Sequence, residues 1–322
     1  MHGRHLTLSD REVLAQRHAQ GEHPADIAQE LGCHVRTVYR ELERNATAGQ
    51  YYPARAQALA DGRRRASKRP WKLENPALGQ YVQDKFCQYW SPEQISGRLE
   101  IDFPDRPAMR ISPQALYEWI ARQKASGGSW HTYLRQSHRR RRKRYGTVEN
   151  RGRIADRVGI EQRPAEVEAK SRLGDWESDT IAGSSSPVYL ASHVERISKY
   201  TVLAQLPDGR AQSLNAGTVR AFARHGDLPR HTTTADNGKE FAAHTALSRQ
   251  LGWSVYFAHP YHAWERGLNE NTNGLVRQFF PKGLDLACVR GQDIRRVEEL
   301  LNHRPRKSLN YRTPAEVMSR SP

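Results

Sequence analysis

The N-terminal part of the chain, residues 1–50, carries apolar side chains at the spacing of three short helices. Ser9 and Glu12 form an S-x-x-E pattern, the sequence signature of a capping box. The first helix is therefore predicted to begin near Asp10, with Leu14 on its inner face.

The second and third predicted helices are separated by Gly32 and differ in charge. The third covers residues 34–44, with Val38 inward and Glu41 on a polar, mostly basic outer side. Two short helices joined by a glycine turn, the second one basic, are typical of a helix-turn-helix that places its last helix in a DNA major groove. A protein-contact module is the alternative, which the basic outer side disfavours. The side chains predicted to contact DNA are Arg36, Thr37, Arg40 and Arg44.

Two basic segments, residues 51–73 and 126–165, are predicted to be linkers. The first is rich in Arg, Ala and Gly, and the second contains the most basic run of the chain. Such a run cannot pack as a core, and we expect it to contact phosphate with a salt-sensitive affinity. It comprises Arg139, Arg140, Arg141, Arg142, Lys143 and Arg144.

Residues 74–125, between the two linkers, regain helical periodicity. Ser91-Pro92 and Ser112-Pro113 each have the composition of a helix start. We interpret this stretch as a second small helical module that binds DNA. A second helix-turn-helix is one form that it could take.

From about Gly174 the pattern changes to β-rich segments that alternate with helical ones. Three consecutive strands, followed by alternating strands and helices, describe a mixed α/β domain over residues 166–322. The predicted strands cover residues 176–181, 188–194, 200–206, 231–235 and 254–259, and the predicted helices cover 213–224, 239–251, 269–279 and 293–302.

The charge of the chain points to a polyanionic partner. Lys and Arg number 51 against 35 Asp and Glu, giving a formal net charge of +16 in 322 residues. Such an excess is most useful when a polyanion neutralises it, and nucleic acid is the leading candidate. Three widely spaced cysteines predict neither a disulfide framework nor a zinc module, and no stretch approaches the roughly 18 to 20 apolar residues of a membrane span. We therefore expect a cytoplasmic protein with no membrane association.

Three acidic residues of the α/β domain are candidates for catalysis. Asp179 lies on the first predicted strand, Asp236 follows the fourth, and Glu270 is near the start of a late helix. If the fourth strand pairs beside the first, the three carboxylates converge and require a compensating cation. Mg²⁺ accepts a few carboxylates and leaves positions for water and phosphate oxygens, and two such ions can activate a nucleophile and stabilise a leaving oxygen.

Each acid has a simpler interpretation. Asp175 and Glu177 share the strand face of Asp179, so one of them could be the catalytic acid, or both could be solvated or paired with arginine. Asp236 belongs to a D-N-G sequence, which is also a turn signal. Glu265 competes with Glu270 as the third acid.

His259 and His262 could be metal ligands, but no cysteine or further histidine completes a set. We expect them to pack or to contact DNA.

The sequence resembles transposases of the IS30 family of bacterial insertion sequences, and the resemblance covers most of the chain. It rests on blocks at the front, in the α/β domain and at the end. These blocks are LTLSDREVLAQRHAQGEHPADIAQELG, TVYRELERN, GDWESDTIAG, TADNGKEFA, HPYHAWERGLNENTNGLVRQFFPKG and LNHRPRKSLNYRTPAEVM.

The resemblance implies an RNase H-like catalytic domain, a mixed sheet flanked by helices, whose metal-binding acids fall on Asp179, Asp236 and Glu270. The 33 residues between the last two match the spacing of the family. It also implies a basic residue seven positions after the glutamate, and Arg277 stands there, facing DNA. Ser178 replaces the usual glycine before the first Asp, a small-for-small change expected to matter little.

The chain is therefore predicted to be a DNA transposase that binds the terminal inverted repeats of its element, cleaves a DNA strand and joins it to target DNA. Two Mg²⁺ ions are the expected cofactors, with Mn²⁺ as a substitute, and a homodimer or larger assembly on DNA is implied by resemblance. A DNA-binding repressor without catalysis and a structure-selective nuclease without a joining step are the alternatives.

Overall fold

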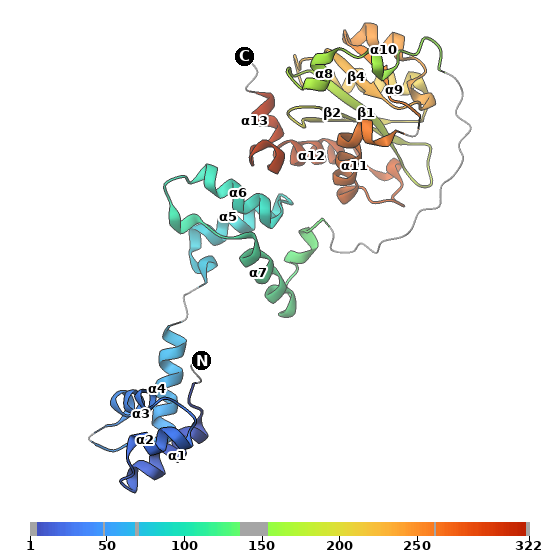
Figure 1. Ribbon diagram of the computed structural model, residues 1–322. Helices are drawn as coiled ribbons and strands as arrows, with labels where there is room; N and C mark the ends of the chain where they lie inside the picture. The colour runs from blue at the N-terminus through green and yellow to red at the C-terminus, as the bar shows by residue number, and fades with distance from the viewer. Residues whose placement is uncertain (1–4, 48, 68–70, 136–153, 261, 320–322) are drawn as a thin grey trace. The chain divides into compact units, whose positions relative to one another are not determined.

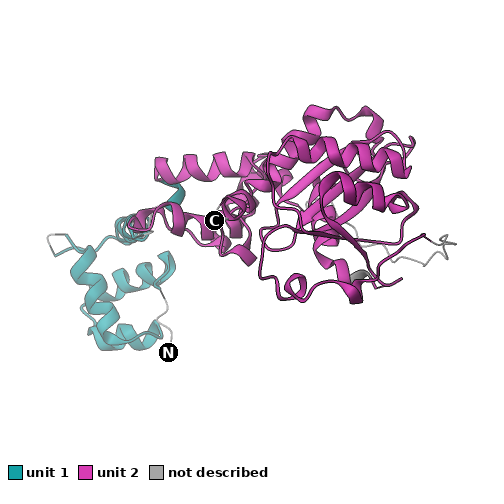
Figure 2. Cartoon of the chain, turned by 90° about the horizontal axis from the view of Figure 1, so that it is seen from above, with its two compact units in different colours: residues 1–74 teal, residues 75–322 magenta. Residues whose placement is uncertain are grey.

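The computed structural model describes residues 5–47, 49–67, 71–135, 154–260 and 262–319. The chain divides into two compact units, residues 1–74 and 75–322, which Figure 2 distinguishes by colour. Within the described residues, no helix combines the length and apolar character that crossing a membrane requires.

The first unit contains four helices: α1 (Leu8–Ala19), α2 (Pro24–Glu30), α3 (Val35–Asn45) and α4 (Pro53–Ala66). Their core includes Leu14, fully buried on α1 as predicted. The predicted α1 cap was wrong by two residues at each position. Thr7 and Asp10 form the capping box instead of Ser9 and Glu12, so the helix begins at Leu8.

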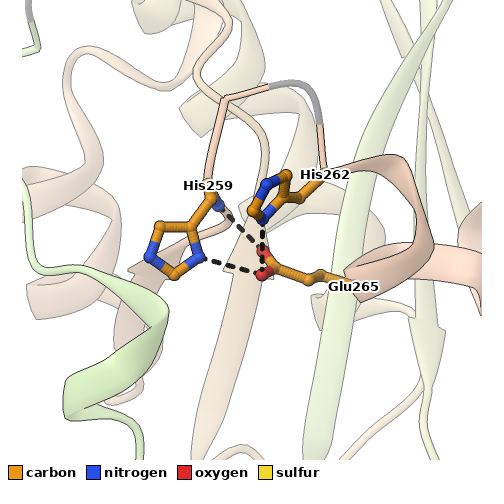
Figure 3. Close-up of side chains that lie close together, drawn as sticks. All are labelled: His259, His262 and Glu265. Carbon is orange, nitrogen blue, oxygen red and sulfur yellow. Dashed lines mark hydrogen bonds and ion pairs between the residues drawn. The ribbon is translucent and has the colours of Figure 1, made fainter.

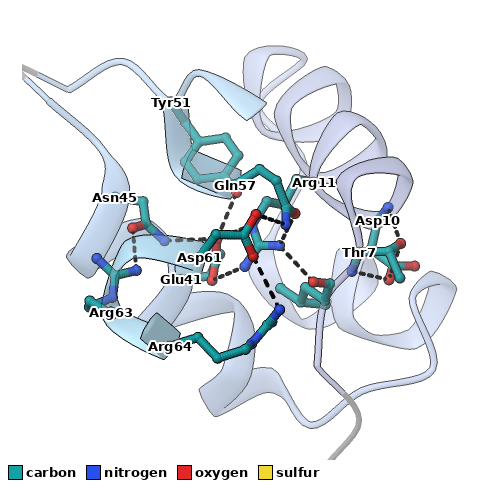
Figure 4. A network of polar contacts seen from close by, with 11 residues as sticks. Thr7, Asp10, Arg11, Glu41, Asn45, Tyr51, Gln57, Asp61, Arg63 and Arg64 are labelled. Carbon is teal, nitrogen blue, oxygen red and sulfur yellow. Dashed lines mark hydrogen bonds and ion pairs between the residues drawn. The ribbon is translucent and has the colours of Figure 1, made fainter. Parts of the chain in front are cut away.

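The segment predicted as a linker, residues 51–73, contains α4, which packs against α1 and α3. Ala56 of α4 is fully buried. Arg11 of α1, only 4% exposed, donates to Gln57 of α4 and to Glu41 of α3 at 2.7 Å each (Figure 4). The linker prediction is therefore corrected for α4, and so is the outward placement of Glu41, because that carboxylate neutralises a buried arginine.

The second unit begins with three helices, α5 (Pro76–Cys87), α6 (Pro92–Asp102) and α7 (Pro113–Ala125). Ser91 and Ser112 cap α6 and α7 through hydrogen bonds to backbone N–H groups, as their Ser-Pro sequences predicted. The predicted second helical module is thus present as three helices.

A five-stranded sheet forms the centre of the α/β domain, in the order β3-β2-β1-β4-β5. β1 pairs antiparallel with β2 and parallel with β4, so the condition for the two aspartates to converge, the fourth strand beside the first, is met. The strands are β1 (Asp175–Ala182), β2 (Tyr189–Glu195), β3 (Thr201–Leu206), β4 (Thr232–Ala235) and β5 (Ser254–Phe257).

Helices cover both faces of the sheet (Figure 1). On one face, α9 (Ala211–Ala223) and α10 (His244–Leu251) enclose a core centred on buried aromatic rings, among them Trp176. On the other, α11 (Gly267–Phe279) and α12 (Gly291–Asn302) pack on aliphatic side chains of the strands. This is the mixed α/β, RNase H-like architecture that the sequence predicted.

Shorter elements complete the second unit. The α-helices are α8 (Ala165–Ala169) and α13 (Pro314–Met318). The 3₁₀ turns of the two units are η1 (Lys72–Glu74), η2 (Pro107–Met109), η3 (Trp130–Tyr133), η4 (Ile160–Gln162), η5 (Lys239–Phe241), η6 (Ala263–Arg266), η7 (Leu286–Cys288) and η8 (Lys307–Leu309). The turns η3 and η4 and helix α8 lie within residues 126–165 or at their border, so that predicted linker has ordered ends.

The C-terminal segment joins the helical module to the α/β domain within the second unit. Arg98 of α6 forms a bidentate ion pair with Glu316 of α13, with Nη2–Oε1 and Nη1–Oε2 distances of 2.5 and 2.7 Å. Gln94 donates to the carbonyl of Pro305 at 2.8 Å. A Cβ at Gly97 would overlap the ring of Tyr311, so the close approach here requires glycine.

Candidate active site

The three acids of β1 have different surroundings, although they share one strand face. Asp175 is buried, accepts from the hydroxyl of Thr232 at 2.8 Å and pairs with Arg172 at 3.2 Å. Glu177 is also buried, accepts from the Asn269 backbone N–H at 3.2 Å and lies 3.7 Å from the Arg196 guanidinium. Both therefore have structural partners of the kind that the simpler interpretation foresaw.

Asp179 and Asp236 meet around one arginine. Arg266 Nη1 lies 3.5 Å from Asp179 Oδ1, and Arg266 Nη2 lies 3.7 Å from Asp236 Oδ2. These side chains are between 14% and 23% exposed, so solvent reaches them only in part. The parallel pairing of β1 with β4 brings the two aspartates together from positions 57 residues apart in the chain.

Asp236 also forms the turn that its D-N-G sequence indicates. Its Oδ1 accepts from the backbone N–H of Gly238 at 2.8 Å, while its Oδ2 faces Arg266. The turn interpretation and the ligand interpretation are thus compatible, because the turn fixes one oxygen and directs the other toward Asp179.

Helix α11 approaches Asp179 through an asparagine that the sequence did not single out. Asn273 Nδ2 donates to Asp179 Oδ2 at 2.8 Å, and Asn273 Oδ1 accepts from the Ser192 hydroxyl at 2.7 Å. Glu270 lies in the first turn of α11, exposed and one turn before Asn273. The spacing of three positions between Glu270 and Asn273 was the available signal, since such residues share a helix face.

Burial and neighbouring charges shift the pKa of the Asp179 carboxyl. Burial raises the pKa of the Asp179 carboxyl above its usual range, the Arg266 cation opposes that rise, and the Asp236 carboxylate adds to it. A carboxylate that is costly to ionise, beside a second carboxylate, is stabilised by any further cation that binds between them.

The residue before Asp179 supports the sheet from inside. The Ser178 hydroxyl lies 2.7 Å from His193 Nδ1 on β2 and 2.6 Å from the Thr233 hydroxyl on β4. His193 is fully buried, and burial lowers its pKa to about 3, so the ring is neutral. The expectation that serine here matters little is therefore corrected, because its hydroxyl satisfies two buried polar groups.

Arg277 lies on α11 as the predicted spacing requires, but its guanidinium contacts the protein. It donates to the carbonyl of Ala182, the last residue of β1, at 2.7 Å. Burial lowers the pKa of this arginine, which is half-buried.

His259, His262 and Glu265 form a compact cluster (Figure 3). Both Nδ1 atoms face the same carboxylate oxygen of Glu265, at 2.9 and 3.2 Å. Among the described residues, no other group of three His, Cys, Asp or Glu side chains has its ligand atoms within 4.8 Å of one another, and this includes Asp179, Asp236 and Glu270. Glu265 was not predicted as the third member of this cluster, because only a cysteine or a further histidine was expected to complete a ligand set.

The predicted DNA-contacting residues divide into described and undescribed ones. Arg36, Arg40 and Arg44 are exposed on α3 and Thr37 is half-buried, consistent with an outer helix side. The basic run Arg139, Arg140, Arg141, Arg142, Lys143 and Arg144 lies outside the described residues.

Comparison with known proteins places two domains on the chain. Residues 2–45 match the helix-turn-helix domain family, and residues 170–263 match the integrase core domain family. The second match covers β1 to β5 and ends before α11, so it includes Asp179 and Asp236 but not Glu270.

Three curated relatives are similar over nearly the whole chain. The transposase for insertion sequence element IS4351 of Bacteroides fragilis is 38% identical, over 97% of this chain and 95% of its own. The transposase for IS1086 of Cupriavidus metallidurans is 37% identical, over 91% and 88%. Transposase InsI for IS30A of Escherichia coli is 34% identical, over 98% and 84%. The chain belongs to the IS30 family of insertion-sequence transposases.

Proposed function

We propose that this protein is the transposase of an insertion sequence, which binds the terminal inverted repeats of its element, cleaves a DNA strand and transfers the freed 3′ end to target DNA. The observation that carries the proposal is the meeting of Asp179 and Asp236 around Arg266, next to the helix that bears Glu270. Relatives with transposase names and an integrase core support the same reaction class.

The donor set fits a divalent metal ion. Asp179 Oδ1 and Asp236 Oδ2 lie 3.5 and 3.7 Å from the Arg266 guanidinium, so the two carboxylates meet at one cation. Oxygen-only donors favour Mg²⁺, with Mn²⁺ as a substitute. Bound there, two such ions would activate water or a 3′-hydroxyl and stabilise the departing oxygen of a phosphodiester.

The protein's own residues would hold and orient these ligands. Asp179 is the proposed shared ligand, and Asp236 and Glu270 would each hold one ion. Asn273 fixes the Asp179 carboxylate through its 2.8 Å hydrogen bond, while the turn at Gly238 fixes Asp236. Because these supports belong to a strand, a turn and a helix, the carboxylates are preorganised before DNA arrives.

Recognition of DNA ends is proposed for the first unit, through the basic outer side of α3. Arg36, Thr37, Arg40 and Arg44 would meet the major groove and the adjacent phosphates. Because two ends must be held together for transposition, we also propose a dimer or larger assembly on DNA.

The test uses labelled duplex DNA that carries a terminal repeat, incubated with the whole protein and Mg²⁺. We expect cleaved and strand-transfer products that Asp236→Asn abolishes. Asp227→Asn is the matched control, because Asp227 is an exposed acid that precedes β4, whereas Asp236 follows it. A repressor would bind the DNA with no products, and Asp179→Ala would change nothing. A nuclease would cleave without joining.

A further inference from the structure

A cavity of about 1020 Å³ lies between the helical module and α11, inside the second unit. Its walls include Gln94 of α6, Arg135 after η3, Asn271 of α11, and the segment that follows α12, which contributes Arg304 and Arg306. This segment is part of the C-terminal sequence block LNHRPRKSLNYRTPAEVM, which the proposed chemistry of the acids does not use.

Arg304 is buried in the cavity wall without a carboxylate partner in its hydrogen bonds. It is 4% exposed and donates to two amide oxygens, Gln94 Oε1 at 2.9 Å and Gln278 Oε1 at 3.0 Å. Burial lowers its pKa to about 9, and the nearby Arg306 and Arg135 cations add to this. The guanidinium is still charged at neutral pH, so a positive charge is kept in a poorly solvated place.

Arg306, beside Arg304, has a hydrogen-bond donor of its own that is unsatisfied. Its Nη2 donates to the carbonyl of Leu301 at 3.0 Å, but its Nε is buried and has no hydrogen-bond partner among the described residues. Burial lowers the pKa of Arg306 to about 10, and Arg135 adds to this effect. A buried guanidinium N–H without an acceptor is rare in native proteins and indicates a ligand that supplies one.

Arg135 lines the same cavity. A Cβ at Gly274 of α11 would lie 2.5 Å from Arg135 Nη2, so glycine leaves room for this guanidinium against the helix. The cavity lining contains one acidic side chain, Glu93, and that carboxylate is already 2.7 Å from Lys307 Nζ. The lining of the cavity therefore combines three arginines with one acidic side chain, which already pairs with a lysine.

We propose that this arginine pocket, formed by Arg135, Arg304 and Arg306, binds a backbone phosphate of the DNA substrate. Arginine suits this role because its planar fork of donors matches phosphate oxygens, and a phosphate would supply both the negative charge and the acceptor that Arg306 Nε lacks. The proposal rests on the proposed function, because it takes the substrate to be DNA.

The position of the pocket indicates which part of the DNA it would hold. Asn271, in its wall, follows Glu270 directly on α11. Asn273, three positions after Glu270, contacts Asp179. A phosphate in the arginine pocket would thus be held on the neighbouring face of the helix that carries a proposed metal ligand, which would position the strand near the acids.

The test measures binding of labelled duplex DNA by the whole protein in EDTA, by fluorescence anisotropy at a series of salt concentrations. Arg306→Gln keeps a polar side chain at this position but removes the charge. We expect weaker binding and a slope of log affinity against log salt reduced by about 0.9, the value for one phosphate contact. Arg135→Gln should have the same effect, and the double variant should lower the slope by no more than this, because the pocket holds a single phosphate.

Arg210→Gln is the matched control, because this arginine is 82% exposed and also loses one charge. Thermal unfolding confirms that each variant is folded. An unchanged slope in folded Arg306→Gln and Arg135→Gln overturns the proposal. So does stabilisation of the wild type, but not of the variants, by inorganic phosphate with no change in the DNA slope, because the ligand would then be free phosphate. Cleavage plays no part in this assay, so failure of the pocket and failure of the transposase activity are distinguishable.

Discussion

Helix α11 lies between two clusters of buried charge with opposite composition. On the sheet side, the carboxylates of Asp179 and Asp236 both lie beside the Arg266 cation. On the other side, Arg304 and Arg306 hold positive charge with only amide and carbonyl acceptors in their hydrogen bonds. The first cluster has an excess of negative charge and the second an excess of positive charge. The first is therefore suited to a metal cation and the second to a phosphate.

The largest expected effect separates the two candidate third acids. Glu270→Gln should lower strand cleavage and transfer by on the order of 10³-fold, because a metal ligand is lost at the reacting centre. Glu265→Gln should keep most of the activity, because its carboxylate is bonded to His259 and His262. Both are measured as initial rates with saturating DNA and Mg²⁺. Equal losses in the two variants would contradict the assignment of Glu270.

The second effect concerns the support beneath the carboxylates. Ser178→Gly should lower the free energy of unfolding by about 2 kcal/mol, because His193 Nδ1 and the Thr233 hydroxyl lose their shared partner in a buried place. Urea denaturation followed by tryptophan fluorescence measures it. Ser254→Gly, at an exposed position of β5, controls for the flexibility of glycine in a strand. If both variants lose the same free energy, the buried hydroxyl contributes nothing.

A third prediction compares the two clusters directly. Arg266→Gln should tighten Mg²⁺ binding by up to about tenfold, equivalent to about 1.4 kcal/mol, because the guanidinium no longer competes for the two carboxylates. Arg306→Gln should leave Mg²⁺ affinity unchanged, because that arginine faces no carboxylate. Calorimetric titration of the DNA-free protein distinguishes them. A weaker Mg²⁺ affinity in Arg266→Gln would mean that the arginine organises the site.

The strands and helices of the α/β domain were predictable from the sequence, because strand periodicity and turn residues are local signals, whereas the pairing of β1 with β4 entered only as a condition. The position of Asp179 on β1 and of Asp236 after β4 followed from them. The meeting of these aspartates at Arg266 did not, because it depends on the path of the chain between β5 and α11.

The incorrect predictions for α4 and Ser178 have a common physical cause. Helix α4 resembled a linker because its residues are mostly Arg, Ala and Gly, and its order depends on contacts with Arg11 and on the burial of Ala56. Ser178 seemed interchangeable with glycine because its partners, His193 and Thr233, are on neighbouring strands. Tertiary partners of this kind leave no periodic pattern in the sequence.

The smallest expected effect tests the ion pair of Arg98 and Glu316, which joins α6 to the C-terminal segment. The hydrogen bond from Arg98 lowers the pKa of Glu316 from 4.5 to about 2. Because the folded pKa is the lower one, the pair contributes stability above about pH 4.5, and this contribution is lost as the pH falls toward 2. Glu316 is 36% exposed, so solvent screening limits the contribution to under about 1 kcal/mol.

Glu316→Gln keeps the cap at Thr313, since glutamine also serves in a capping box. Its unfolding temperature should therefore fall less than that of the wild type between pH 4.5 and 2, whereas Glu118→Gln, an exposed acid of α7, should follow the wild type. Parallel pH profiles for all three proteins would mean that the C-terminal segment docks on α6 without help from this ion pair, and that the arginine pocket is assembled by its amide and apolar contacts alone.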